Sequence, residues 1–466
     1  MKKARLLSVI SALALLASSA MTGCGSKSEE GSNGSSGGGA TTKEGKTVLK
    51  LMTFTKEVKQ MCEKYFETHP DFAEKYELKV TEIPTTDGQF QPALDQALAG
   101  GGEDAPDFYC AEAAFVLKYT KGDASSFACP YDELGIDVES KINEAEIAPY
   151  SVEIGRNNDG KVVGLGYQAT GGAFIYRRSV AEAAFGTDDV AEVEKQIGAG
   201  SGDWDKFFKC ADDLKKKNIA IISGDGDLWH AVENSSDTGW VVNGELNIDP
   251  KREAFLDLSK QLKDNGYHND TQDWTDGWFA DMKGEGEKPV LGFFGPAWLI
   301  NYSLKDNCGG TKIGEGTYGD WAVCQSPVGF FWGGTWVIAN KNSKNKEAVG
   351  KIIEWITLDT SESGLQYMWA NGTFDPSNPT KDCVASNVVM SKSDGKVDIL
   401  GGQNMFDVFQ KANEFAKGDN LTQFDEGINS QWRDQVRQYT GGAKSRDAAI
   451  KDFKQAIGDT FDIKVN

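Results

Sequence analysis

Hydrophobic positions follow two different periods in the stretch that begins at residue 47. Residues 48–54 are short and mostly apolar, as in a buried strand, and residues 78–83 alternate apolar with polar side chains. Between these two strands, residues 57–67 place apolar side chains at helical spacing. After the second strand, residues 90–99 form a predicted helix that ends at three glycines. With a further short strand at 107–110, the order strand, helix, strand, helix, strand predicts a parallel sheet.

The rest of the chain continues to mix strands and helices, without a repeat or an internal linker. Ser445 suits the N-cap of the last helix, and Gly458 suits its end. The further predicted strands are 162–165, 173–176, 219–222, 289–294 and 336–339, and the further predicted helices are 203–214, 252–264, 344–357 and 445–457.

The first 24 residues have the pattern of an export signal. Three basic residues precede an apolar stretch at 6–17, which is too short to cross about 30 Å of hydrocarbon, and small residues follow. Met21-Thr22-Gly23-Cys24 resembles the bacterial lipobox, in which the cysteine is lipidated and becomes the mature N-terminus. The alternative is an ordinary signal with an incidental cysteine. We expect lipidation at Cys24 and a place on the extracellular face of the cell membrane.

A tether follows the predicted lipid. Residues 25–46 contain no large apolar side chain and are rich in Gly and Ser, so they cannot bury enough surface to order themselves. A flexible segment of this length spans roughly 25 Å on average. Residues 1–23 are therefore predicted as the signal peptide and 24–47 as the tether.

Composition narrows the function classes. The chain has 466 residues and a net charge of −21, which argues against binding to nucleic acid or to anionic lipid. The length behind the tether exceeds one typical core, so two lobes are expected. The 12 Trp and 13 Tyr are numerous enough for some rings to line a groove.

Cysteine and histidine spacing gives no sign of a metal or catalytic centre. Apart from Cys24, seven Cys are scattered without a C-x-x-C pair, and an odd number leaves at least one thiol unpaired. Unpaired cysteines act as small buried hydrophobes and fit an anaerobic habitat. The three His are far apart and match no metal-ligand spacing. We expect no metal, no cofactor and no catalytic residue.

Polar residues that follow the predicted parallel strands are candidates for ligand contacts. Ligands of open α/β sheets bind beyond the carboxyl ends of the strands. Glu57 follows the first strand, Gln89 the second and Glu112 the third. Each of the two acids could instead serve as a first-turn acid that favours a helix dipole.

The order of motifs resembles one family over the whole length, the extracellular solute-binding proteins of ABC importers of the maltose-binding type. The segments that carry the resemblance, in order, are the lipobox, LAGGGEDAPDFY at 98–109, DGKVVGLGYQATGGAFIYRR at 159–178, FFGPAW at 293–298, GDWAVCQSPVG at 319–329, GGTWVIANKNSKNKEAVGKIIEWI at 333–356 and the C-terminal helix. Each segment alone is weak, whereas their order across about 420 residues behind a lipobox is specific. One departure is Gly166, where the family usually has proline.

The resemblance implies an α/β fold of the two-lobe, type II periplasmic-binding-protein kind, with the ligand cleft between the lobes. Lobe 1 would comprise 48–168 and 333–380, and lobe 2 would comprise 169–332 and 381–466. The chain would cross between them near 168–171, 332–334 and 376–381. The implied partners are an oligosaccharide, the transmembrane subunits of an ABC permease and the membrane through Cys24, with the protein itself a monomer.

The resemblance also adds aromatic and polar residues to the predicted site. Tyr167 would lie at the first crossover, and Trp298 resembles the family's sugar-stacking tryptophan. Trp274 and Trp278 are expected to pack or to cover the rim. The remaining predicted ligand contacts are Trp229 after a strand and a glycine-rich loop, Trp332 and Trp336 around Gly333-Gly334, and Gln403 and Asn404 after Gly401-Gly402.

Two other functions stay open at this point. The same fold could bind a peptide, a polyamine or a glycerol phosphate, and an acid-rich cleft would favour a cation. A surface lipoprotein of another class, a glycoside hydrolase, would need a pair of carboxylates. No such pair stands out among the 70 Asp and Glu residues.

Overall fold

The computed structural model describes residues 45–85 and 88–465. The predicted signal, Cys24 and most of the predicted tether lie outside the described residues. Among the residues that are described, no helix is both long enough and apolar enough to span a membrane.

The predicted parallel unit forms the first part of the larger sheet. Strand β1 (Thr47–Thr53) pairs in parallel with β2 (Tyr76–Glu82) and with β3 (Phe108–Glu112). Helix α1 (Lys56–Thr68) connects β1 to β2, and α3 (Phe90–Gly100) lies between β2 and β3 in the chain. The alternation of periods in the sequence therefore predicted this unit correctly, to within two residues at most element ends.

A strand from much later in the chain completes this sheet. Strand β10 (Thr335–Ala339) is antiparallel to β3 on one side and to β4 (Gly164–Gly166) on the other. Over the described residues the sheet has five strands in the order β2-β1-β3-β10-β4. The segment just before β10 is thereby brought beside the carboxyl end of β3.

A second sheet contains three strands within the described part of the chain, in the order β8-β5-β9. Strand β5 (Ala173–Arg177) is antiparallel to both β8 (Gly292–Gly295) and β9 (Trp321–Cys324). The chain passes between the two sheets at 167–172 and again at 325–334. These two connections run side by side and are joined by a hydrogen bond of 3.1 Å from the Trp332 amide to the Thr170 carbonyl.

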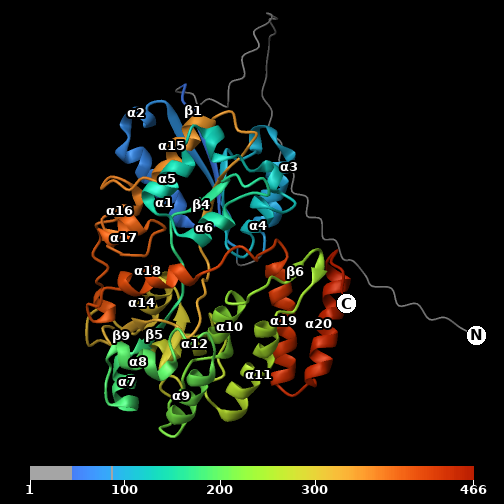
Figure 1. Ribbon diagram of the computed structural model, residues 1–466. Helices are drawn as coiled ribbons and strands as arrows, with labels where there is room; N and C mark the ends of the chain where they lie inside the picture. The colour runs from blue at the N-terminus through green and yellow to red at the C-terminus, as the bar shows by residue number, and fades with distance from the viewer. Residues whose placement is uncertain (1–44, 86–87, 466) are drawn as a thin grey trace, which may run out of the picture. The chain divides into compact units, whose positions relative to one another are not determined.

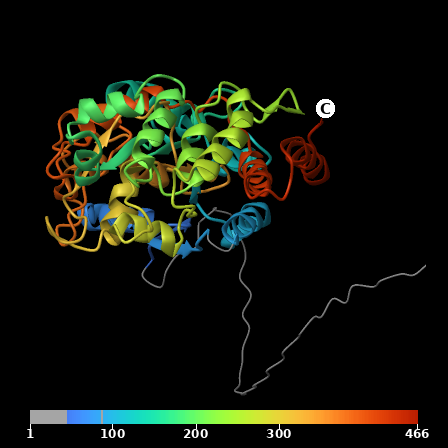
Figure 2. The ribbon, with the colours of Figure 1, turned by 90° about the horizontal axis from the view of Figure 1, so that it is seen from below.

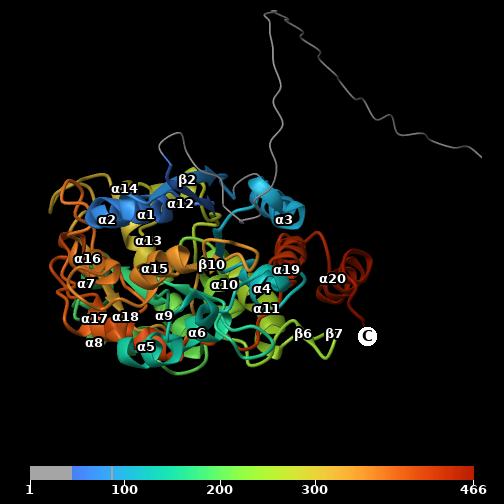
Figure 3. The same ribbon diagram turned by 90° about the horizontal axis from the view of Figure 1, so that it is seen from above.

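The helices lie around these sheets (Figure 1). The two C-terminal helices, α19 and α20, pack side by side, as the views from below and from above also show (Figures 2 and 3). A short ribbon is formed by β6 (Val241–Val242) and β7 (Glu245–Leu246). The other helices are α2 (Pro70–Ala73), α4 (Val116–Thr120), α5 (Val138–Ala145), α6 (Pro149–Ile154), α7 (Arg178–Phe185), α8 (Val190–Ile197), α9 (Asp205–Lys215), α10 (Asp225–Glu233), α11 (Pro250–Asn265), α12 (Asp276–Lys283), α13 (Ala297–Leu299), the π-helix η4 (Ile300–Leu304), α14 (Lys305–Asn307), α15 (Lys346–Thr357), α16 (Leu365–Asn371), α17 (Asn387–Ser391), α18 (Phe406–Phe415), α19 (Asp425–Thr440) and α20 (Arg446–Thr460), with short 3-10 turns at Gly102–Asp104, Ser125–Phe127, Tyr131–Leu134 and Asp398–Leu400.

One predicted strand and the predicted end of the last helix were wrong. Residues 219–222 form only isolated bridges, from Ala220 to Val290 and from Ile222 to His268, so they are not a ladder strand. The last helix does begin after its N-cap Ser445, but it continues through Gly458 to Thr460. A glycine inside a helix costs only about 1 kcal/mol, which the packing of this helix offsets.

The chain stays beside the larger sheet's helices for some way after the predicted third crossing at 376–381. The Ala148 amide donates to the Ala385 carbonyl at 2.9 Å, and α17 contacts α5. Helix α18 then contacts β5 of the second sheet. The lobe boundary at 381 therefore stays a prediction, and the contacts favour a passage after α17.

All seven described cysteines are buried and unpaired. They lie in the apolar cores on both sheets: Cys62 and Cys110 pack in the core that contains Leu51 and Ile352, and Cys324 packs in the core that contains Phe174. They act as small apolar side chains, as the sequence predicted.

Candidate functional site

Three tryptophans and one histidine from separate segments form an aromatic cluster. The Trp298 and Trp332 rings lie 4.7 Å apart in an edge-to-face arrangement, and Trp274 is parallel to Trp298 with centroids 6.1 Å apart. His230 stacks on Trp332 with centroids 3.5 Å apart. We call Trp274, Trp298, Trp332 and His230 the aromatic cluster. Aromatic groups of this size supply a large apolar contact area with a polar handle.

The backbone around the cluster is specialised. Gly333 and Gly334, after Trp332, have φ values of 72° and 117°. A side chain on Gly333 would approach the Trp298 indole, whose Nε1 donates to the Trp332 carbonyl at 2.9 Å. Trp274 also has a positive φ, 66°, although its side chain is bulky and 53% exposed. A strained backbone that carries a large, exposed aromatic ring is typical of a functional surface.

A cavity of about 230 Å³ adjoins the cluster at Trp332 and His230. Four acids line it, and neither Lys nor Arg is among its described lining residues. We call it the Trp332 cavity. Its acids are Glu112 at the end of β3, Glu233 at the end of α10, and Asp425 and Glu426 at the start of α19.

Each acid of the Trp332 cavity is held by a neighbouring donor. Glu112 accepts from the Ala114 amide at 2.8 Å, and Asp425 accepts from the Thr422 hydroxyl at 2.6 Å. Burial raises the pKa of Glu112 to about 7 and that of Asp425 to about 6, and it also raises the pKa of Glu233. Burial disfavours the charged form, so these groups are poised to share hydrogen bonds with a ligand near neutral pH.

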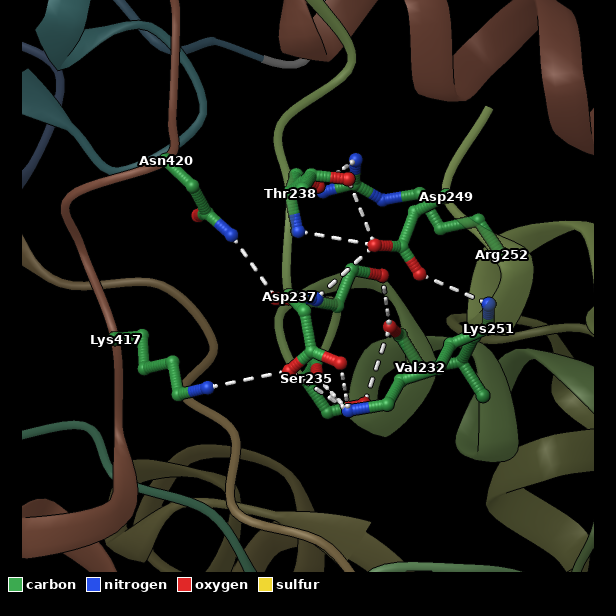
Figure 4. Close-up of polar contacts among 10 residues, drawn as sticks. Val232, Ser235, Asp237, Thr238, Asp249, Lys251, Arg252, Lys417 and Asn420 are labelled. Carbon is green, nitrogen blue, oxygen red and sulfur yellow. Dashed lines mark hydrogen bonds and ion pairs between the residues drawn. The ribbon is translucent and has the colours of Figure 1, made fainter. Parts of the chain in front are cut away.

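A polar network lies behind Glu233 and the segment before α19, and Figure 4 shows its contacts around Asp249 and Asn420. Asp249 accepts from the backbone amides of Asp237 and Thr238, and Arg252 donates to the Glu233 carbonyl at 3.0 Å. Asn420 donates to the Ser236 carbonyl at 3.0 Å. The network therefore connects the end of α10 to the segment that contains Thr422 and Asp425.

A second, larger cavity of about 530 Å³ lies at the start of α1. Its lining includes Glu57, Tyr302, Trp369 and Phe374. We call it the Tyr302 cavity. The Glu57 carboxylate accepts a short hydrogen bond from the hydroxyl of Tyr167, and burial raises the pKa of Glu57 to about 7.

The described residues contain no group of three or more His, Cys, Asp or Glu that could hold a metal ion.

Comparison with known proteins identifies the family. A family model described as bacterial extracellular solute-binding protein matches residues 60–395, well over half of the chain. The chain belongs to this family. A comparison with curated protein sequences finds no match.

Solved structures share the fold of this solute-binding protein. A protein described as extracellular solute-binding protein family 1 has a TM-score of 0.69 at 17% identity, covering 88% of this chain and 99% of its own. The galacto-N-biose/lacto-N-biose I-binding protein of a Bifidobacterium longum ABC transporter, in complex with lacto-N-biose, has a TM-score of 0.64 at 17% identity, covering 91% and 99%. The sugar-binding protein MalE of Xanthomonas citri has a TM-score of 0.65 at 15% identity, covering 89% and 97%. The expected family and the two-lobe type II α/β fold are confirmed.

The structure brings two of the predicted tryptophans of this solute-binding protein into one site. Trp298 and Trp332 belong to the aromatic cluster, and Glu112 shares the Trp332 cavity. Glu57 and Tyr167 instead meet each other beside the Tyr302 cavity.

Other predicted residues lie elsewhere. Trp229 is buried against Phe255, with centroids 4.8 Å apart, in the core of the second sheet. Trp336 is buried on β10 and donates to the Ser151 carbonyl at 2.9 Å. Gln89 is exposed just before α3 and lines none of the cavities described above.

Gln403 and Asn404 are occupied by contacts within the fold. The side-chain oxygen of Gln403 accepts from the Val323 backbone N–H, and its side-chain nitrogen donates to the Val323 carbonyl, both at 2.8 Å. The side chain therefore pairs with β9 much as a neighbouring strand would. Asn404 bonds to Asp407 and to the Phe406 amide at the start of α18.

Trp274 and His230 of the aromatic cluster were missed as site residues. Trp274 was expected only to pack or to cover the rim, and the sequence has no signal for its parallel approach to Trp298. His230 follows Trp229 directly, so a shift of one residue in the phase of α10 decides which of the two reaches the cluster.

A buried acid near the Tyr302 cavity makes the stability of the protein depend on pH. Asp382 is 2% exposed, and burial raises its pKa from 3.8 to about 7. The folded protein accommodates the protonated Asp382 better than the charged one. The contribution of Asp382 to the free energy of unfolding is therefore highest below about pH 4 and falls as the pH rises through about 7. In the wild type, Asp382 should lower the free energy of unfolding by up to about 4 kcal/mol between about pH 4 and about pH 8. Asp382→Asn should abolish this part of the pH dependence. Urea unfolding across this range measures the effect.

Asp419→Asn, at an exposed aspartate, is the matched control for Asp382→Asn and should keep the full pH dependence. Equal pH slopes for wild type and Asp382→Asn would show that this carboxyl titrates normally.

Proposed function

We propose that the protein is the substrate-binding component of an ABC importer and that it captures a neutral oligosaccharide. The observation that carries the proposal is the aromatic cluster beside the acid-lined Trp332 cavity. Sugars are held by stacking of their C–H faces on aromatic rings and by hydrogen bonds from fixed polar groups. The sugar complexes among the structural neighbours support the same ligand class.

The arrangement along the chain supports delivery to a permease. We propose that lipid on Cys24 holds the protein at the extracellular face of the membrane, and that residues 24–47 leave the body free to move. The two predicted lobes, with their last boundary moved from 381 to the segment after α17, would close on the ligand by a hinge motion. A local tether raises the effective concentration at the permease.

The proposed ligand contacts come from both sides of the cleft. Trp274, Trp298 and Trp332 would stack on the sugar, and Glu112 would accept from its hydroxyls. In a desolvated cleft a missing hydroxyl leaves its partner unpaired, so such contacts discriminate strongly. The protein would bind and release its ligand without chemical change.

Calorimetry on the purified mature protein tests this function. We expect heat of binding with at least one member of a panel of malto-, xylo-, manno- and cello-oligosaccharides, and unchanged saccharide after prolonged incubation. Silence with the whole panel would refute the sugar ligand, and cleavage products would point to a hydrolase.

A polyamine is a second candidate ligand, favoured by one observation. The titratable side chains among the described lining of the Trp332 cavity are four acids and His230. An ammonium group could sit between these carboxylates and the Trp332 ring, which attracts cations. Adding spermidine and putrescine to the calorimetric panel separates the two candidates.

A further inference from the structure

The Tyr302 cavity has the composition of a carbohydrate subsite. Its three aromatic side chains are Tyr302, which is 44% exposed, and Trp369 and Phe374, which are mostly buried. Its volume of about 530 Å³ lies in the usual range for small-molecule sites, about 300–1,000 Å³. An exposed ring suits stacking on a sugar face.

Polar groups of this cavity are left without partners. Trp369 is 7% exposed, and its indole Nε1 has no hydrogen-bond partner among the described residues. A buried donor without a partner costs about 1–3 kcal/mol. The side chains of Gln60 and Asn378 also line the cavity, and neither forms a hydrogen bond with another residue in the described part of the chain. The exposed side-chain amides of Gln60 and Asn378 thus offer both donors and acceptors to a neutral polyol, whereas the Trp369 Nε1 is buried beneath the cavity surface.

The charged lining of the cavity does not single out an ion. Lys56 and Lys64 contribute positive charge, and Lys64 is paired with Glu67 at 3.1 Å. Glu63 is paired with Lys59 at 3.0 Å, and Glu57 is held by Tyr167. The lining holds two lysines and four acids, and each of the acids (Glu57, Glu63, Glu67 and Asp375) already has a hydrogen-bond or ion-pair partner within the protein, which favours an uncharged ligand.

The Tyr302 cavity is adjacent to the aromatic cluster through one short helical stretch. Trp298 lies in α13, and Tyr302 lies four residues later in η4, which continues from α13. Four residues span slightly more than one turn of an α-helix, and slightly less than one turn of a wider π-helix such as η4. Side chains at this spacing lie on the same face. One helical face therefore carries a ring of the aromatic cluster and a ring of the Tyr302 cavity.

The larger sheet relates the two cavities in the same way. Glu112 of the Trp332 cavity is the last residue of β3, and Glu57 of the Tyr302 cavity follows the end of β1. Strands β1 and β3 are parallel neighbours, so their carboxyl ends lie at one edge of the sheet. Adjacent strands are about 4.8 Å apart. Each cavity therefore has a lining acid that follows a strand at the same edge of the sheet.

We propose that the Tyr302 cavity is a further subsite for the same ligand, which is an extended oligosaccharide. One part of the chain lies in the Trp332 cavity, the middle stacks on the aromatic cluster and a further sugar unit enters the Tyr302 cavity. The inference rests on the proposed function of this protein as a sugar-binding protein. It adds chain length to that function, because a disaccharide would reach only one of the two cavities.

A comparison of chain lengths tests the subsite. Calorimetry on the mature protein uses disaccharides and hexasaccharides of the malto-, xylo-, manno- and cello- series. Wild type should bind the hexasaccharide of its preferred series at least tenfold more tightly than the disaccharide. Tyr302→Ala and Gln60→Ala, both at exposed side chains, should each weaken the hexasaccharide about tenfold and the disaccharide less than twofold.

Ile313→Ala is the matched control, since Ile313 is a large apolar side chain, 65% exposed, outside both cavities. It should bind both lengths as wild type does. Equal losses for the two lengths in Tyr302→Ala, or unchanged affinities in both Tyr302→Ala and Gln60→Ala, would overturn the subsite while leaving sugar binding intact. Failure of wild type to bind any saccharide would instead refute the proposed function, and the subsite with it.

Discussion

Replacing Trp332 with alanine is expected to weaken the binding of the preferred oligosaccharide about a hundredfold. Trp332 lines the Trp332 cavity, and its ring contacts both His230 and Trp298. A buried aromatic side chain covers about 150–250 Å², and burial contributes about 25 cal/mol per Å². A loss of about half of that free energy, near 2.7 kcal/mol, corresponds to two decades in Kd. Calorimetric titration measures the change.

Trp204→Ala is the matched control for Trp332→Ala. Trp204 is half-buried, packs on Phe207 and Phe294, and lines neither cavity. We expect it to bind as wild type does once folded. If the two variants lose affinity equally, the loss reflects general destabilisation and the aromatic cluster does not contact the ligand.

Replacing Trp229 with alanine is expected to lower the free energy of unfolding by about 3–5 kcal/mol, as for large-to-small changes in protein cores. Trp229 is 4% exposed, packs on Phe255 and lies 5.9 Å from the Arg433 guanidinium that covers its ring. The affinity of the folded fraction should stay within about threefold of wild type. Urea unfolding gives the first quantity and calorimetry the second.

Trp229→Phe keeps an aromatic ring in the core and should recover most of the lost stability. A Trp229→Ala protein that unfolds like wild type but fails to bind the sugar would show that the side chain reaches the ligand, as the sequence had suggested.

The periodicity of the sequence was sufficient for the first half of the larger sheet. Short apolar runs alternate with helical spacing there, and parallel strands follow one another along the chain. Strand β10 was also predicted, but its position between β3 and β4 depends on contacts far apart in sequence. The same rule about carboxyl ends of strands selected Glu57 and Glu112, which line two different cavities.

The choice among tryptophans could not be made from the sequence. Successive residues of a helix point about 100° apart, so the neighbours Trp229 and His230 of α10 face a core and the aromatic cluster respectively. Trp332 and Trp336 flank two glycines with positive φ, and only the first joins the cluster. Gln403 shows the opposite case, because a polar side chain that suits a sugar is used to pair with β9.

The seven buried thiols bear on how the protein matures. Burial raises the pKa of each, which keeps them protonated and poorly nucleophilic. Within 45–85 and 88–465 no disulfide joins two cysteines, so non-covalent contacts hold this part together. Folding of this part of the chain therefore requires no disulfide formation or disulfide exchange at these cysteines.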